Sequence, residues 1–145
     1  MRAVSRRKPT RAAEAQIELV ATPCDAARLA RTVMNEEQET FVVICLNVRN
    51  MLIGKPIVVA MGTAHEVRVH PRDVFREAVR CNAVGVVVLH NHPSGATEPS
   101  IDDIAITRRL IKCGELLNVV LLDHVIVTTT SANSLAANEP KLWLE

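Results

Sequence analysis

A short segment from His90 to Asp103 links a predicted buried strand to a predicted helix, and it constrains the fold more than any other stretch. The apolar run at 84–89 before it is typical of a buried strand bounded by turn residues. Because residues i and i+2 of a strand point to the same face, His90 and His92 would direct two imidazoles into one space. Pro93 then ends the pairing of the strand, since it has no N–H to donate.

Ser100 and Asp103 follow at the start of the next predicted helix. Ser100 is a favourable N-cap, and Asp103 at the third helical position is close to a capping box in which Asp replaces Glu. From there its carboxylate can point back toward the end of the strand. Two imidazoles and one carboxylate leave a fourth tetrahedral position open, as in a catalytic zinc site and unlike a closed structural one. Taken singly, the serine–aspartate pair predicts only a helix cap, and each histidine only a polar surface or core residue.

The spacing His90-x-His92, seven residues, Ser100-x-x-Asp103 matches the JAMM (MPN+) metalloprotease signature without a gap. The flanking residues, from Val69 to Val74 and from Leu89 to Gly95, are similar to the RadC branch of that superfamily. The resemblance runs from about Ala21 to about Leu135, nearly the whole chain. The letters His-Asn-His also occur in HNH nucleases, but those enzymes scatter their three residues over a hairpin and a helix.

This resemblance implies a fold, a metal and a reaction. The fold is α/β, a single-domain mixed β-sheet flanked by helices, with the cytidine-deaminase-like architecture of the JAMM/MPN superfamily. The metal is Zn²⁺, with His90, His92 and Asp103 as its ligands. Zinc polarises carbonyl oxygens and lowers the pKa of water from about 15.7 to roughly 7, so the implied reaction is hydrolysis of a peptide or isopeptide bond.

The family also places a glutamate base ahead of an early strand and a serine beside the metal. Glu39, immediately before Thr40, is the matching position for the base, with Glu36 and Glu37 as weaker substitutes. Without the resemblance, Glu39 would be interpreted as a solvated member of an acidic cluster. Ser100 would donate to the developing oxyanion as well as cap the helix, and such a donor is worth about 3–4 kcal/mol in other enzymes.

The pattern of apolar residues predicts the element order α-β-β-β-α-β-α-β-β, a mixed sheet with helices on both sides. A flexible basic arm is expected at 1–18, a RadC-like JAMM/MPN domain at 19–136 and a C-terminal tail at 137–145, with order fading from about Thr130. The first three strands are expected to form an antiparallel meander. The expected helices lie near 23–35, 71–82 and 100–113, the last ending at Gly114, and the expected strands near 40–46, 57–61, 65–70, 84–89, 118–122 and 124–129, the last two joined at Asp123.

The composition fits one packed domain, because the 145 residues are 48% hydrophobic. No apolar run approaches the roughly 20 residues that span a bilayer, so no membrane partner is expected. The four cysteines form no C-x-x-C pair and are expected to pack as small apolar residues, which suits a reducing cytoplasm. They are Cys24, Cys45, Cys81 and Cys113.

Positive charge is concentrated at the N-terminus. The first fifteen residues carry five basic residues against one acidic residue, whereas the remainder carries 12 basic and 15 acidic residues. The arm could contact phosphates, but the folded part is not a basic nucleic-acid-binding body. Aromatic residues make up only 2% of the chain, which argues against a base-stacking surface. Nucleic acid as a partner rests only on the family association and on the arm.

The main alternative function is a non-catalytic, metal-stabilised binding module of a DNA-repair or recombination assembly. A deaminase is rejected because the P-C-x-x-C ligand pair is absent. Longer RadC proteins carry a helix–hairpin–helix segment ahead of this domain, and here only the basic arm is expected in its place, so the expected DNA association is weaker. Exposed edge strands in the early hairpin could pair in a homodimer.

Overall fold

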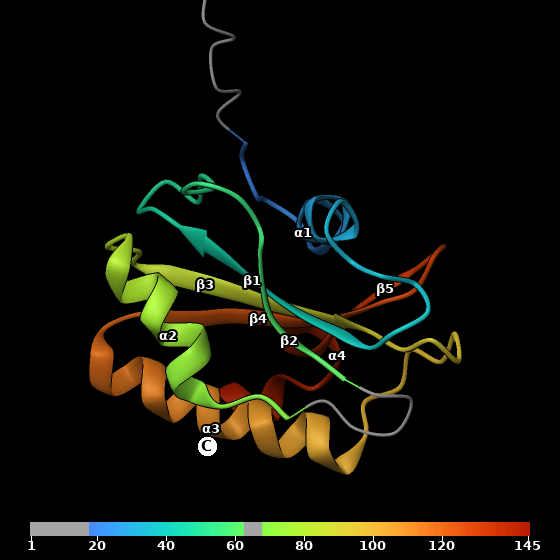
Figure 1. Ribbon diagram of the computed structural model, residues 1–145. Helices are drawn as coiled ribbons and strands as arrows, with labels where there is room; N and C mark the ends of the chain where they lie inside the picture. The colour runs from blue at the N-terminus through green and yellow to red at the C-terminus, as the bar shows by residue number, and fades with distance from the viewer. Residues whose placement is uncertain (1–17, 63–67) are drawn as a thin grey trace, which may run out of the picture.

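The computed structural model describes residues 18–62 and 68–145, and its centre is a five-stranded sheet (Figure 1). The strands span Thr40–Leu46 (β1), Ile57–Met61 (β2), Gly85–Asn91 (β3), Val120–Val127 (β4) and Ala132–Ser134 (β5). They lie in the order β2-β1-β3-β4-β5. β3 and β4 run parallel, and the other neighbouring pairs are antiparallel. The predicted mixed sheet is confirmed.

Helices cover both faces of the sheet, as predicted. The helices span Pro23–Arg31 (α1), Pro71–Arg80 (α2), Ile101–Leu117 (α3) and Leu135–Asn138 (α4), and a 3-10 turn spans Pro140–Trp143 (η1). α1 lies on one face, whereas α2 and α3 lie on the other (Figure 1). None of the helices in the described part of the chain is long and apolar enough to cross a bilayer.

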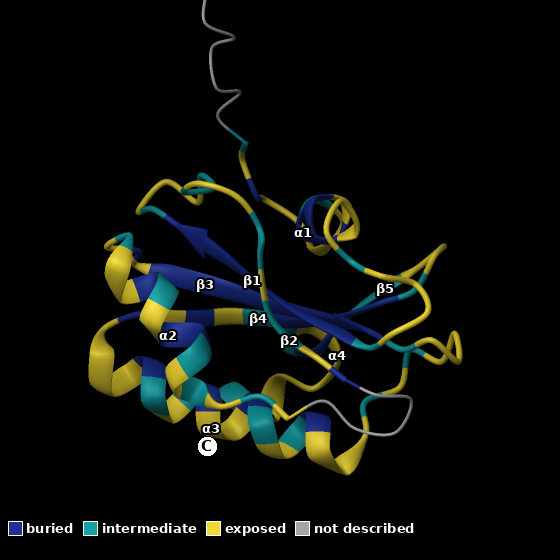
Figure 2. Ribbon diagram, in the orientation of Figure 1, coloured by how far each residue is buried: buried dark blue, intermediate teal, exposed yellow. Residues whose placement is uncertain are grey.

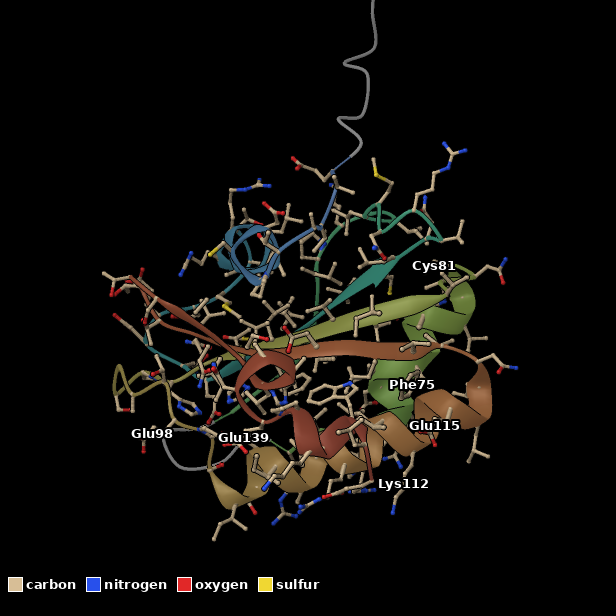
Figure 3. The ribbon with its side chains drawn as sticks, turned by 180° about the vertical axis from the view of Figure 1, so that it is seen from behind. Phe75, Cys81, Glu98, Lys112, Glu115 and Glu139 are labelled. Atoms are coloured by element: carbon tan, nitrogen blue, oxygen red, sulfur yellow. The ribbon has the colours of Figure 1, made fainter. Side chains whose placement is uncertain are left out.

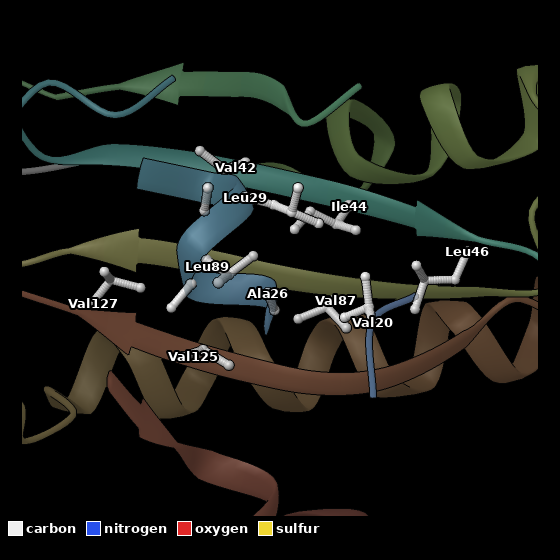
Figure 4. Close-up of a cluster of buried hydrophobic side chains, with 12 residues drawn as sticks. Val20, Ala26, Leu29, Val42, Ile44, Leu46, Val87, Leu89, Val125 and Val127 are labelled. Atoms are coloured by element: carbon white, nitrogen blue, oxygen red, sulfur yellow. The ribbon is translucent and has the colours of Figure 1, made fainter. Parts of the chain in front are cut away.

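β1 and β3 are buried along their whole length (Figure 2). Val42 of β1 and Leu89 of β3 pack beneath α1 (Figure 4). Val43 packs on the opposite face, in a cluster with Phe75 of α2 and Leu110 of α3; Figure 3 shows Phe75 on α2 from behind. Burial on both faces explains why these two strands have nearly continuous apolar sequences rather than alternating ones.

β4 is one continuous strand, so the prediction of two strands joined at Asp123 is wrong. Its pairing with β3 skips Leu122, which is the extra residue of a β-bulge. Leu121 packs into the cluster beneath α2 and α3, and after the bulge Ile126 packs against residues of α3. The bulge shifts the alternation by one residue, and His124 therefore points to the α3 face. In the sequence, the same break in alternation resembles a turn.

α3 continues beyond Gly114, where the sequence predicted its end. Asn118 ends the helix in the left-handed conformation, with φ of 54°. Gly114 has a packing role instead, because a Cβ there would lie 2.3 Å from the carbonyl oxygen of Val119. The glycine lets the helix approach the start of β4 closely.

The C-terminal segment is ordered, contrary to the prediction that order fades from Thr130. β5 pairs with β4, and Leu135 and Leu142 are buried. The Asp123 carboxylate stabilises this segment, since it accepts hydrogen bonds from the Ser134 hydroxyl at 2.6 Å and from a backbone N–H of α4 at 3.0 Å. The polar residues at the start of this segment suggested a loop, although it also carries the two leucines that are buried.

Two predicted elements fall wholly or partly outside the described residues. They are the basic arm, of which only Glu18 is described, and the third strand at 65–70. Residues 68–70 are not in a strand, and β1 pairs with β2 on one side and with β3 on the other.

Candidate metal centre

The alternation of β3 determines where its polar residues point. Val88 packs on the face of α2 and α3, so His90 and His92 point to that face too. Leu89 packs on the face of α1, and Asn91 follows it. β3 extends to Asn91 rather than ending at Leu89, so His90 lies inside the sheet and its side chain is only 1% exposed.

The N-terminus of α3 brings a carboxylate to the end of β3. The Ser100 hydroxyl oxygen accepts a hydrogen bond from the backbone N–H of Asp103 at 3.0 Å. In return, Oδ2 of Asp103 accepts from the backbone N–H of Ser100 at 2.8 Å. The predicted capping box is therefore confirmed. It also holds the carboxylate toward the start of the helix, where the histidines lie.

Four side chains place one possible ligand atom each within 4.8 Å of one another: Glu39, His90, His92 and Asp103. The Nε2 atoms of His90 and His92 are 2.8 Å apart. Asp103 contacts both rings, with Oδ1 at 3.2 Å from His90 and Oδ2 at 3.1 Å from His92. Glu39 is more distant, with Oε1 at 3.7 Å from Nε2 of His90. The donor atoms of His90, His92 and Asp103 therefore lie close together, and the Glu39 carboxylate lies slightly outside them.

The charges in this cluster are strongly coupled. Burial raises the pKa of the Asp103 carboxyl, but the neighbouring side chains of His90 and His92 outweigh this effect and hold the pKa far below its usual range. The hydrogen bond to Asp103 raises the pKa of His92, against an opposing effect of burial. Asp103 is therefore ionised at neutral pH, and it attracts positive charge to the point where the rings meet.

The donor chemistry fits a divalent cation. Nδ1 of His92 lies 2.9 Å from the carbonyl oxygen of Ala96, which can only accept, so Nδ1 carries a hydrogen and Nε2 is the atom that can bind a metal in place of a proton. Nε2 faces Nε2 of His90 and an ionised carboxylate. Donor atoms that converge in this way repel one another unless a cation lies between them. A tetrahedral zinc with bonds of about 2.0–2.1 Å separates its donors by roughly 3.3 Å, close to the spacing observed.

Glu39 is the only member of its acidic run that joins the four-residue group among the described residues. Its side chain is 25% exposed, so it faces both the cluster and solvent. Glu36 and Glu37, the weaker substitutes, are exposed. Glu36 lines a neighbouring hollow instead. The geometry therefore favours Glu39 over these two as a partner of the cluster.

Asn91, between the two histidines, anchors the segment that carries Glu39. Its side-chain oxygen accepts from the backbone N–H of Thr40 at 2.7 Å. Its amide group donates to the carbonyl oxygens of Asn35 and Gln38, both at 2.9 Å. Sequence reasoning missed this residue, although its strand position, on the face opposite to the histidines, was a signal that it contacts a different part of the chain.

Replacing Asn91 by alanine is expected to destabilise the fold by about 2–3 kcal/mol, because the N–H of Thr40 loses its side-chain acceptor and the carbonyl oxygens of Asn35 and Gln38 each lose one hydrogen bond. Chemical denaturation of the variant and the wild type measures this difference. Gln38→Ala is the matched control, because it retains the backbone carbonyl that Asn91 binds, and its effect should stay within about 0.5 kcal/mol. Equal stability of Asn91→Ala and wild type would contradict the anchoring role.

Two further histidines lie near the cluster but do not belong to the group of four. His124 is fully buried, and its Nε2 atom contacts Nδ1 of His90. Burial lowers its pKa well below the usual value. His70 occupies the N-cap of α2, without a side-chain capping bond. His65 lies outside the described residues.

Residues of the cluster line two separate hollows. One, of about 310 Å³, is lined by Glu39, His90 and Asp103 together with Phe41, His70 and Arg109 among others. The other, of about 160 Å³, is lined by His92, by Arg31 of α1 and Met34 just after it, and by Pro93 and Gly95 of the β3–α3 loop, among others.

Comparison with known proteins agrees with this architecture. The model of the RadC-like JAB domain matches residues 20–140. A UPF0758 protein of Cyanothece sp. is 44% identical over 120 residues, which cover 83% of this chain and 49% of that protein. A UPF0758 protein of Clostridioides difficile is 46% identical over 91 residues, covering 63% of this chain and 38% of that protein. The chain spans about half the length of the curated relatives it matches. It belongs to the family of RadC-like JAB domains.

Proposed function

We propose that this domain is a zinc-dependent hydrolase of the JAMM type that cleaves peptide or isopeptide bonds. The observation that carries the proposal is the convergence of His90, His92 and Asp103 on one point, with the Glu39 carboxylate beside it. Three protein ligands leave a coordination position open for water or substrate, whereas a structural zinc is normally closed by four. The family membership supports the same donor set.

Each residue of the cluster has a distinct proposed role. His90, His92 and Asp103 would hold the metal, which would serve as a Lewis acid and lower the pKa of a bound water toward neutrality. Glu39 accepts a proton from the attacking water and later delivers it to the leaving amine, as a general base and then a general acid. Its Oε1 atom lies 3.7 Å from Nε2 of His90 and its side chain is 25% exposed, so the carboxylate borders both the cluster and the solvent.

Ser100 is proposed to stabilise the developing oxyanion. Its oxygen accepts the capping bond from the backbone of α3, which leaves the hydroxyl hydrogen for donation. The serine also lies at a helix N-terminus, where the aligned peptide dipoles favour negative charge. The position of the serine is therefore compatible with both functions.

The proposal is tested by removing and restoring the metal. Chelator-treated protein is expected to lose cleavage of a library of linear and isopeptide-linked peptides, monitored by mass spectrometry, and one equivalent of zinc should restore it. Protein that binds zinc but cleaves nothing would favour the alternative, a metal-stabilised binding module. Cleavage that persists without metal would contradict the proposal.

Several other expectations stay predictions. A cytoplasmic location is supported by the four cysteines, all of which are free. Association with nucleic acid and a homodimer formed through the edge of the early hairpin likewise stay predictions.

A further inference from the structure

His124 of β4 lies behind His90, on the side away from the proposed metal. Its Nε2 atom is 2.7 Å from Nδ1 of His90. Its Nδ1 atom is 2.6 Å from the hydroxyl oxygen of Thr107 on α3. Each contact has the length of a hydrogen bond, so each must contain one hydrogen.

Thr107 determines the direction of both bonds. Its hydroxyl oxygen also lies 2.6 Å from the backbone carbonyl oxygen of Asp103. A carbonyl oxygen can only accept and a hydroxyl has a single hydrogen, so Thr107 donates to Asp103. The same hydroxyl oxygen must then accept the hydrogen on Nδ1 of His124.

Because Thr107 accepts from Nδ1 of His124, it also determines which partner donates in the hydrogen bond between His124 and His90. A neutral imidazole has one N–H, so with its hydrogen on Nδ1 the Nε2 atom of His124 is an acceptor. It accepts a hydrogen bond from the N–H at Nδ1 of His90, so Nε2 of a neutral His90 keeps a free lone pair. A doubly protonated His124 is disfavoured because the ring is wholly buried and its hydrogen-bond partners, a hydroxyl and an imidazole, carry no negative charge.

We infer that Thr107 and His124 are positioning residues that keep the hydrogen of His90 on Nδ1, so that Nε2 is the atom that binds the metal. The inference rests on the metal site of the proposed function but not on the reaction. Phe41 supports the same orientation, since its ring stacks on His90 at a centroid distance of 5.9 Å and meets His124 edge-on at 5.5 Å. The bulge in β4 also contributes, because it is what points His124 to this face.

Substitution of Thr107 tests the inference without touching a ligand. Thr107→Val has nearly the same shape but no hydroxyl, so His124 loses the acceptor that fixes its hydrogen on Nδ1. Competition of the full chain with a chromophoric chelator should show zinc affinity weakened about 10–100-fold, whereas Thr107→Ser, which keeps the hydroxyl, should stay within about threefold of wild type. Circular dichroism of each variant monitors folding.

A second measurement makes the test independent of that variant. Long-range proton–nitrogen NMR spectra of the zinc-loaded wild type should show the ring hydrogens of His124 and His90 on Nδ1. Folded Thr107→Val with wild-type zinc affinity, or a His124 hydrogen on Nε2, would overturn the inference while the metal site stands. Wild-type protein that binds no zinc would overturn both.

Discussion

Glu39→Gln is expected to retain zinc and to lose hydrolysis by about 10²–10⁴-fold, the contribution typical of a general base. Glutamine has the shape of glutamate but cannot accept the proton of the attacking water. Because Glu39 is the outermost of the four donors, at 3.7 Å from Nε2 of His90, its replacement should leave the three closer ligands in place. The measurement is kcat/KM on a cleaved peptide, together with the zinc content of the same preparation.

Glu37→Gln is the matched control for this experiment. Glu37 belongs to the same acidic run, but its side chain is exposed and it does not join the cluster. Activity of this control should equal that of the wild type. A fully active Glu39→Gln, or an inactive Glu37→Gln that retains zinc, would show that the base was assigned to the wrong carboxylate.

His92→Ala is expected to lower the zinc content from about one ion per chain to nearly none. His92 lies just beyond the end of β3, and its side chain is more exposed than that of His90, so its removal should damage the core less. Asp103 would lose one of the two imidazoles that favour its ionised form. Elemental analysis of the purified, dialysed protein measures the effect.

His70→Ala is the control for the loss of a histidine as such. It lines one of the hollows but is not a member of the four-donor group, so zinc content should be unchanged. Equal zinc in His92→Ala and wild type would place the metal elsewhere.

Local patterns in the sequence were sufficient to predict the core of the site. Strand alternation places His90 and His92 on one face, and the capping box directs Asp103 toward them. Both are local effects that act within a few residues. The position of Glu39 could be found only through the family resemblance, because no local pattern brings a residue 51 positions before His90 to the same point.

The supporting contacts could not be predicted, because they depend on pairing between distant segments. Asn91 binds the segment before β1, and Thr107 reaches His124 across the interface of α3 and β4. The bulge at Leu122 is decided by the register of β4 on β3. Likewise, the sequence pattern at Gly114 is typical of a helix end, and only the close approach of the Val119 carbonyl oxygen shows that the glycine is needed for packing.

Anomalous diffraction from a crystal of the zinc-loaded protein tests the central claim most directly. The predicted result is one strong peak about 2.0–2.2 Å from Nε2 of His90, Nε2 of His92 and a carboxylate oxygen of Asp103, with the fourth position held by a non-protein ligand. Glu39 should lie within hydrogen-bond distance of that fourth ligand. A peak bound by four protein side chains, or one located away from these three residues, would contradict a catalytic metal centre.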